Sequence, residues 1–341
     1  MEAEDMEQLA FIGEGIFIYW NSIIIAIAAV AAICFYAAAY VAKEGNLLAL
    51  SSSILLSVFF SVPLSRLVHW YCKSGSYPSF AAAMTDYTTG GYALLGVFAG
   101  CFLAAVLIRA LCISKNLPAM LDCMSFGAIG IAVGRLASLF GASDRGMIVS
   151  DTLQFPFAYQ LVNVVSGTVQ NRLATFMIQS MVAVAIVVGL LLYVLVSKIR
   201  KKQIPNGDIF LIFMLCYCAS QIVCDSTRYD ALVLRSNGFI GMVQVVSLVG
   251  MLMPIGVFMV RLVKRNGFKV KYLAIWIAMG AALGLACYME YIVQNNAHKA
   301  LMAYSTMSAC MAVEVVLTLL CRNFAGNGLK TNASGIAEQK N

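Results

Sequence analysis

The sequence predicts an all-α, polytopic integral membrane protein with about nine transmembrane helices. Of its 341 residues, 61% are hydrophobic and only 11% are charged, whereas an average soluble domain carries about 25% charged residues. The hydrophobic residues gather into continuous runs of about 20 residues, the length that a helix needs to cross a hydrocarbon layer about 30 Å thick. Together these observations exclude a soluble globular protein.

Nine runs along the chain predict one helix each, and the sixth is the shortest. They are Ile18 to Val41, Asn46 to His69, Gly91 to Ile113, Met120 to Phe140, Leu173 to Val196, Ile209 to Cys224, Phe239 to Val263, Tyr272 to Val293 and Ala300 to Leu320. The leader before the first run holds five acidic residues and no Lys or Arg. It lacks the basic region of a secretory signal peptide, so we expect it to stay on the mature protein.

The distribution of basic residues predicts an outer N-terminus and an inner C-terminus. With the N-terminus outside, nine helices place fifteen of the 23 Lys and Arg residues in the inner connections and the C-terminal tail. The inner connections of membrane proteins are enriched in these residues. Topology therefore explains the net charge of +7, and nucleic acid is not an expected partner.

Eight cations remain on the outer side, where the topology rule does not require them. They are Arg66, Lys73, Arg135, Arg145, Arg172, Arg228, Arg235 and Lys299. Three of these, Arg66, Arg135 and Arg228, lie at or just inside the outer ends of the second, fourth and sixth helices. A charge at that depth is costly unless it is paired or faces water, so an anionic partner would explain all three. The alternatives are a snorkelling side chain for Arg135 and solvated ion pairs between residues 224 and 244.

The third and fourth helices carry glycines at the four-residue spacing that lets helix backbones approach closely. The pairs are Gly96 with Gly100 and Gly130 with Gly134. Helix packing is the simplest interpretation of either pair. It would place Arg135 directly after a packed helix face.

Three titratable residues inside the predicted helices are candidates for proton chemistry. His69 follows Arg66 by three residues and so shares its helix face; an interfacial side chain is the ordinary interpretation and proton transfer the alternative. Glu290 and Glu314 lie in the eighth and ninth helices, where a carboxylate is a functional candidate by default. They are either protonated and hydrogen-bonded between the two helices, or the polar relay of a small transporter.

The eleven cysteines predict no metal site. They are odd in number and lie mostly inside the hydrophobic runs, and the closest pair, Cys216 and Cys218, is too tightly spaced for a zinc site. We expect them to act as small core residues. No metal and no other cofactor is expected.

Several motifs in a fixed order resemble the prolipoprotein diacylglyceryl transferase family of bacterial inner membranes. They are SRL at the end of the second helix, TTGGYALLGVFAG from Thr88, GRLASLFGASDRG from Gly134, RLATFMIQS from Arg172, and DSTRYDAL from Asp225 with VQVVSL after it. The resemblance runs from about Ile18 to Arg265. It implies a transferase-like seven-helix membrane domain over residues 16–265. From the sequence outside this region we expect an acidic extracytoplasmic leader over 1–15, two additional helices over 266–322 and a disordered cytoplasmic tail over 323–341.

The resemblance implies a membrane enzyme of the bacterial cytoplasmic membrane. Such an enzyme moves the diacylglyceryl group of phosphatidylglycerol, or of a similar anionic phospholipid, onto the lipobox cysteine thiol of a prolipoprotein and releases glycerol 1-phosphate. Arg135 stands at the glycine-arginine pair of the family, and Arg228 stands at its R-x-D arginine. Both are expected to bind the phosphate, because a guanidinium fork meets two phosphate oxygens at once. The predicted substrate-binding residues are Arg135, Arg228, Arg66, Ser138, Gly134, Gly90, Gly91, Gly96, Asp225, Asp230 and Gln244.

The sequence departs from the family pattern mainly at acid-base positions. Leu95 replaces a histidine, Ser138 and Gly141 replace asparagines, Ser143 replaces a glutamate on an ungapped count, and Ile178 and Gln179 replace a tyrosine and a glutamate, while Thr175 is kept. Leucine cannot accept a proton, so His69 and Asp144 are the predicted catalytic residues. A catalytically inactive lipid-binding or scaffolding relative is the alternative that these departures leave open.

Overall fold

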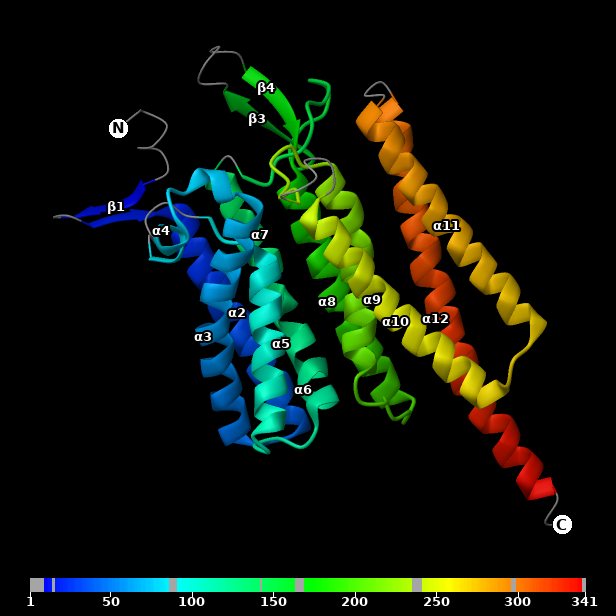
Figure 1. The fold of residues 1–341 in the computed structure, drawn as a ribbon. Coiled ribbons are helices and arrows are strands. Elements are labelled where there is room, and N and C mark those ends of the chain that lie inside the picture. Colours follow the sequence, from blue (N-terminus) through cyan, green and yellow to red (C-terminus); the bar gives the residue numbers. More distant parts are fainter. Residues whose placement is uncertain are drawn as a thin grey trace. The chain divides into compact units, whose positions relative to one another are not determined.

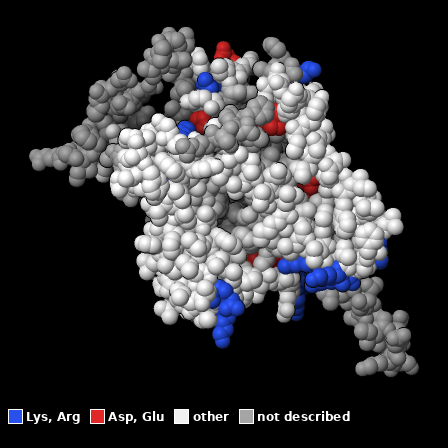
Figure 2. All heavy atoms as spheres, in the orientation of Figure 1, with Lys and Arg blue, Asp and Glu red and all other residues white. Residues whose placement is uncertain are grey.

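The computed structural model of the chain confirms an all-α polytopic membrane protein (Figure 1). It describes residues 9–13, 16–85, 91–141, 143–162, 169–234, 241–295 and 299–338. Eight helical segments in these ranges are long and apolar enough to cross a membrane, and the third predicted run forms a shorter apolar helix of 17 residues. On the face seen in Figure 2, long uncharged stretches of helix surface separate the few charged side chains.

Every predicted run forms helix, and two short strand pairs are added. The elements are β1 (Leu9–Gly13), β2 (Ile16–Tyr19), α2 (Trp20–Lys43), α3 (Leu47–Cys72), η1 (Ser74–Ser76), α4 (Phe80–Thr85), α5 (Leu94–Ala110), α6 (Leu117–Met124), η2 (Ser125–Ala128), α7 (Ile129–Arg135), η3 (Leu136–Phe140), β3 (Ala158–Val162), β4 (Val169–Leu173), α8 (Thr175–Ile199), α9 (Asp208–Ser226), α10 (Met242–Asn266), α11 (Val270–Asn295) and α12 (Ala300–Glu338). The fourth run, predicted as one helix, is built from α6, η2, α7 and η3 in succession.

The chain forms two compact units. Unit 1 comprises Met1–Phe213 and Thr227–Val243, and unit 2 comprises Met214–Ser226 and Gln244–Asn341. The division between them runs through α9.

In unit 1, α3 and α5 pack closely because two glycines of α5 face α3. A side chain on Gly96 would collide with the backbone of Ser65, and a Cβ on Gly100 would lie 2.5 Å from the Cα of Ser61. The hydroxyl of Ser65 also donates to the carbonyl of Ala93 at 2.8 Å. The spacing of these glycines therefore serves helix packing, as the sequence predicts.

One end of unit 1 is organised around the buried carboxylate of Asp122. It lies 2.8 Å from the ammonium of Lys43 at the end of α2. It also accepts hydrogen bonds from the backbone N–H groups of Gly207 at 2.8 Å and Phe210 at 2.9 Å, at the start of α9. Asp122 thus joins α6, the end of α2 and the α8–α9 connection, whose Lys and Arg residues predict the inner side of the membrane.

Elsewhere in unit 1, backbone hydrogen bonds bring three distant segments together beside the β3–β4 hairpin. The antiparallel hairpin pairs Ala158 with Leu173. The N–H of Gly146 donates to the carbonyl of Leu173 at 2.8 Å, and the N–H of Met147 donates to the carbonyl of Thr227 at 3.0 Å. The segment after η3 therefore lies between β4 and the chain that follows α9.

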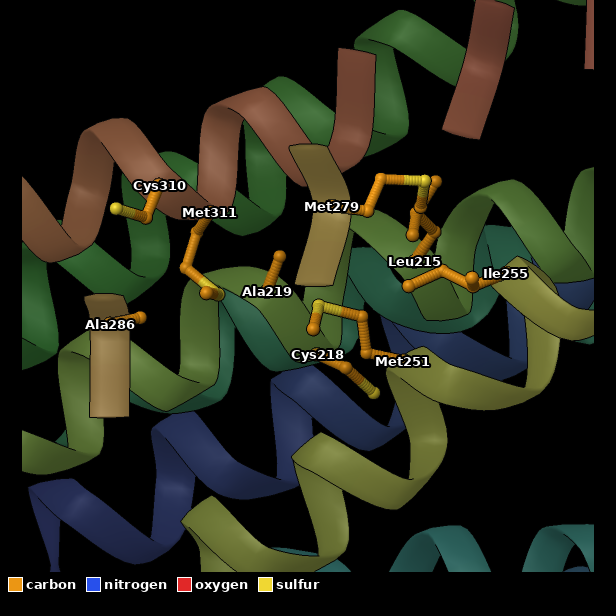
Figure 3. Close-up of a cluster of buried hydrophobic side chains, with 9 residues drawn as sticks. All are labelled: Leu215, Cys218, Ala219, Met251, Ile255, Met279, Ala286, Cys310 and Met311. Atoms are coloured by element: carbon orange, nitrogen blue, oxygen red, sulfur yellow. The ribbon is translucent and has the colours of Figure 1, made fainter. Parts of the chain in front are cut away.

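Unit 2 has its own apolar core, formed by the second half of α9 with α10, α11 and α12. Figure 3 shows its residues, which are Leu215, Cys218, Ala219, Met251, Ile255, Met279, Ala286, Cys310 and Met311. A polar cluster joins the end of α9 to the last two helices. The hydroxyl of Ser226 donates to Glu290 at 2.6 Å, and the hydroxyl of Tyr304 donates to the carbonyl of Ser226 at 3.0 Å.

Candidate functional site

The carboxylate of Asp144 lies between the two arginines that the sequence selects for phosphate binding. Its Oδ2 is 2.7 Å from Nη1 of Arg135, and its Oδ1 is 2.7 Å from Nη2 of Arg228. The hydroxyl of Ser138 donates to the same Oδ2 at 3.2 Å. The structure thus brings Arg135 and Arg228 together on one carboxylate, although they are far apart in the sequence.

Local structure explains how each arginine reaches this point. Arg135 is the last residue of α7, after which the chain tightens into the 3₁₀ turn η3. Arg228 follows the end of α9 by two residues and forms an antiparallel bridge with Gly146. Gly146 is required there, because a Cβ would lie 2.6 Å from the hydroxyl oxygen of Thr175.

Asp230 completes the cluster from the R-x-D motif. Its Oδ1 accepts from Nε of Arg228 at 3.1 Å, and its Oδ2 accepts from the backbone N–H of Asp144 at 3.0 Å. Asp230 therefore binds the guanidinium of Arg228 and also the backbone of Asp144. Its predicted contact with substrate stays a prediction.

The four charged side chains of this cluster are largely shielded from solvent. Their exposed fractions are 13% for Arg135, 14% for Asp144, 11% for Arg228 and 19% for Asp230. Burial alone would raise the pKa of Asp144, but the charges of Arg135 and Arg228 outweigh it and hold that pKa below its ordinary value. Burial alone would lower the pKa of Arg228, but the negative charges of Asp144 and Asp230 outweigh burial and raise that pKa. Asp144 and Arg228 are therefore both ionised at neutral pH.

Two further arginines border this cluster, each stacked on a tyrosine. The guanidinium carbon of Arg145 lies 4.3 Å from the ring centroid of Tyr159, and that of Arg172 lies 4.6 Å from the ring of Tyr229. Arg145 donates to the carbonyl of Gly141 at 2.6 Å. The cluster and its border therefore hold four guanidiniums and two carboxylates, and this excess of positive charge suits an anionic headgroup.

Sequence reasoning placed Arg145 and Arg172 on the outer side but did not connect them with the site. Their positive charge on the outer side, where the topology rule does not require it, was the available signal. The missing information was the fold of the β3–β4 hairpin, which brings Tyr159 over Arg145. Hydropathy does not report on short polar hairpins of this kind.

Arg66 and His69 belong to a different cluster on α3. Arg66 is almost fully buried and donates from Nε to the carbonyl of Ala83 at 2.6 Å and from Nη1 to the carbonyl of Gly91 at 3.0 Å. Nδ1 of His69 is 2.9 Å from the hydroxyl of Tyr77. These contacts fix the chain between α3 and α5, and the substrate-binding role of Arg66 and the catalytic role of His69 stay predictions.

The predicted glycines are chiefly packing residues where the structure describes them. Gly91 has a left-handed φ of +84°, and a Cβ there would lie 2.7 Å from the His69 ring. Gly96 packs on α3 as described above, and a Cβ on Gly134 would make an ordinary contact with Ala28 at 3.5 Å. Gly90 lies outside the described residues.

Two other predicted binding residues lie in unit 2 and not in unit 1 with the arginine pair. Asp225 is buried near the end of α9. Gln244 is in the first turn of α10. Their predicted contacts with substrate stay predictions.

The family follows from a comparison of the sequence with known protein families. Residues 8–260 match the model of the prolipoprotein diacylglyceryl transferase family. The chain belongs to this family. Within the prolipoprotein diacylglyceryl transferase family, the chain is 24% identical over 266 residues to the phosphatidylglycerol–prolipoprotein diacylglyceryl transferase of Clostridium novyi (strain NT). That alignment covers 73% of this chain and 94% of the relative.

Membership of the prolipoprotein diacylglyceryl transferase family confirms the resemblance that the sequence motifs indicate, and with it a membrane transferase. The matched residues include the whole cluster around Asp144. They end within α10, so α11 and α12 lie beyond the family match.

Proposed function

We propose that the chain transfers the diacylglyceryl group of phosphatidylglycerol to the cysteine thiol of a prolipoprotein at the outer side of the bacterial cytoplasmic membrane. Family membership supports the class of reaction. The observation that carries the proposal is the placement of Arg135 and Arg228, each 2.7 Å from one carboxylate and mostly buried. Two guanidiniums held this way form a site for the phosphodiester of the lipid.

The proposed step breaks one carbon–oxygen bond and forms one carbon–sulfur bond. The cysteine thiol loses its proton. Its sulfur then bonds to the carbon of the diacylglyceryl group that carries the phosphate. The bond from that carbon to the phosphate oxygen breaks, and its electron pair stays on the oxygen, so glycerol 1-phosphate leaves with one more negative charge. Arg135 and Arg228 would stabilise this charge as it develops.

The proposed proton acceptor is His69, because Leu95 cannot take the proton and Asp144 is engaged by two arginines. The hydrogen bond to Tyr77 orients the His69 ring. The thiol needs only modest help from this proton acceptor. A thiol with a pKa of about 8.5 is already a few per cent thiolate near neutral pH.

The test is a transfer assay with the purified full-length protein. The protein is mixed with phosphatidylglycerol in detergent micelles and with a peptide that carries a lipobox cysteine, and mass spectrometry follows the mass of the peptide. We expect a diacylglyceryl thioether product, and we expect Arg135→Ala to abolish it.

Lys299→Ala is the matched control, since Lys299 is an exposed cation on the same predicted side. It should keep the wild-type rate. No product from the wild-type protein, under conditions where another family member is active, would overturn the proposal and favour the inactive relative.

A further inference from the structure

Asp144 has a backbone conformation that side chains rarely adopt. Its φ is +58°, in the left-handed region. Among residues other than glycine, Asp and Asn enter this region most readily, and the cost is modest. A turn that needs this conformation and carries a carboxylate is therefore well served by aspartate.

The backbone of Asp144 is fixed on both sides of its Cα. Its N–H donates to Oδ2 of Asp230 at 3.0 Å. Its carbonyl accepts from the N–H of Phe176, in the first turn of α8, at 3.1 Å. The side chain therefore projects from a point that is tied both to the R-x-D motif and to a membrane helix.

The two carboxylate oxygens of Asp144 serve different arginines. Oδ2 binds Arg135 and the hydroxyl of Ser138, and Oδ1 binds Arg228. Two guanidiniums repel each other, and an anion between them removes this repulsion. Since the anion is fixed by its backbone, it also sets the distance between the two cations.

We propose that Asp144 is a positioning residue, which holds the guanidiniums of Arg135 and Arg228 at the separation needed to bind the lipid phosphate. The inference rests on the proposed function and deepens it. It replaces the proton-accepting role that the sequence suggests for Asp144. A carboxyl whose pKa lies below its ordinary value is also a weak proton acceptor at neutral pH.

A double-mutant cycle in the transfer assay tests this role. Asp144→Asn should lower kcat/KM for phosphatidylglycerol by about 100-fold, because misplacing a binding group by about 1 Å has an effect of this size. In an Arg228→Lys background the same change should cost less than about 3-fold, since the pair is already disrupted. Equal costs in both backgrounds would show that Asp144 acts independently of Arg228 and would overturn the inference.

Two further variants separate positioning from proton transfer. Asp144→Glu keeps a proton-accepting group but extends the side chain by about 1.5 Å, so positioning predicts a loss of at least about 10-fold, whereas wild-type activity would overturn the inference. The pH–rate profile of Asp144→Asn should keep the wild-type acid limb, since a carboxyl whose pKa is held below its ordinary value by two arginines contributes none near neutral pH. Disappearance of that limb would identify Asp144 as the base.

The control is Asp151→Asn, at an exposed aspartate a few residues further along the chain, which should behave as wild type. Failure of the proposed function is read separately, from the wild-type protein alone. If the wild type transfers no lipid, the positioning role is tested by measuring how tightly the protein binds phosphatidylglycerol in detergent micelles. Asp144→Asn should then weaken binding by about 10-fold relative to Asp151→Asn, and equal binding by these two variants would overturn the role.

Discussion

At the scale of single residues, Arg135 and Arg228 each lie against a carboxylate. Asp144 binds two arginines and Asp230 binds one. Removing one member of such a buried cluster leaves the others uncompensated, which costs about 3 to 5 kcal/mol. Single charges here should therefore affect stability as well as activity.

The stability of unit 1 should depend on pH through Asp144. Its pKa is lower in the folded chain than the ordinary value of about 3.9 in an unfolded one. Its stabilising contribution is therefore present above the unfolded pKa and is lost as the pH falls through the folded pKa. At pH 7 we expect the wild type to have a higher melting temperature than Asp144→Asn. The corresponding difference in the free energy of unfolding should be about 3 kcal/mol. Melting curves in detergent from pH 7 to pH 3 should show this gap closing, and a gap that stays constant would contradict the prediction.

The two arginines of the site were predictable from the sequence, and their common partner was not. Arg135 and Arg228 stand out because cations are rare at that depth of a predicted membrane helix. Asp144 stands out only as a titratable group near Arg135. Its place between them depends on hydrogen bonds to Asp230 and Phe176, which no local pattern encodes.

At the scale of elements, α3 and α5 approach closely only because glycine faces serine. A Cβ on Gly96 would collide with the backbone of Ser65, and backbone cannot move aside as a flexible side chain can. We expect Gly96→Ala to destabilise the protein by about 1 to 3 kcal/mol, the usual cost of overpacking. Thermal unfolding in detergent would measure the difference.

Gly189→Ala is the matched control for this change. Gly189 lies within α8, and nothing comes within 4 Å of a Cβ built there. Since alanine is the better helix former, this variant should be neutral or more stable by up to about 1 kcal/mol. Equal effects of the two substitutions would show that the α3–α5 contact does not require glycine.

Hydropathy predicted the membrane helices well because their length and composition are set by the bilayer itself. Two features at the element scale escaped it. The 3₁₀ turns η2 and η3 interrupt the fourth run without changing its hydropathy. The place of the β3–β4 hairpin and that of the buried Asp122 are fixed by hydrogen bonds to segments distant in the sequence, which a single run of sequence does not reveal.

At the scale of the whole molecule, α11 and α12 are integral to unit 2 although they lie beyond the family match. Four of the nine core residues shown in Figure 3 come from these two helices. Glu290 and Tyr304 also provide the side-chain contacts that hold Ser226 at the end of α9. The helices α11 and α12 therefore complete a core that α9 and α10 begin.

Removal of α11 and α12 should consequently destabilise the protein. Lipid can cover the apolar faces of α9 and α10, so the loss should arise from tight packing and hydrogen bonds. A chain that ends after Asn266 loses both partners of Ser226, at about 1 kcal/mol for each hydrogen bond, together with the packing around Met251. A chain that ends after Ala325 keeps all these contacts and should melt like the full-length protein. If the chain ending after Asn266 also melted like the full-length protein, the two helices would be accessory to a core that is stable alone.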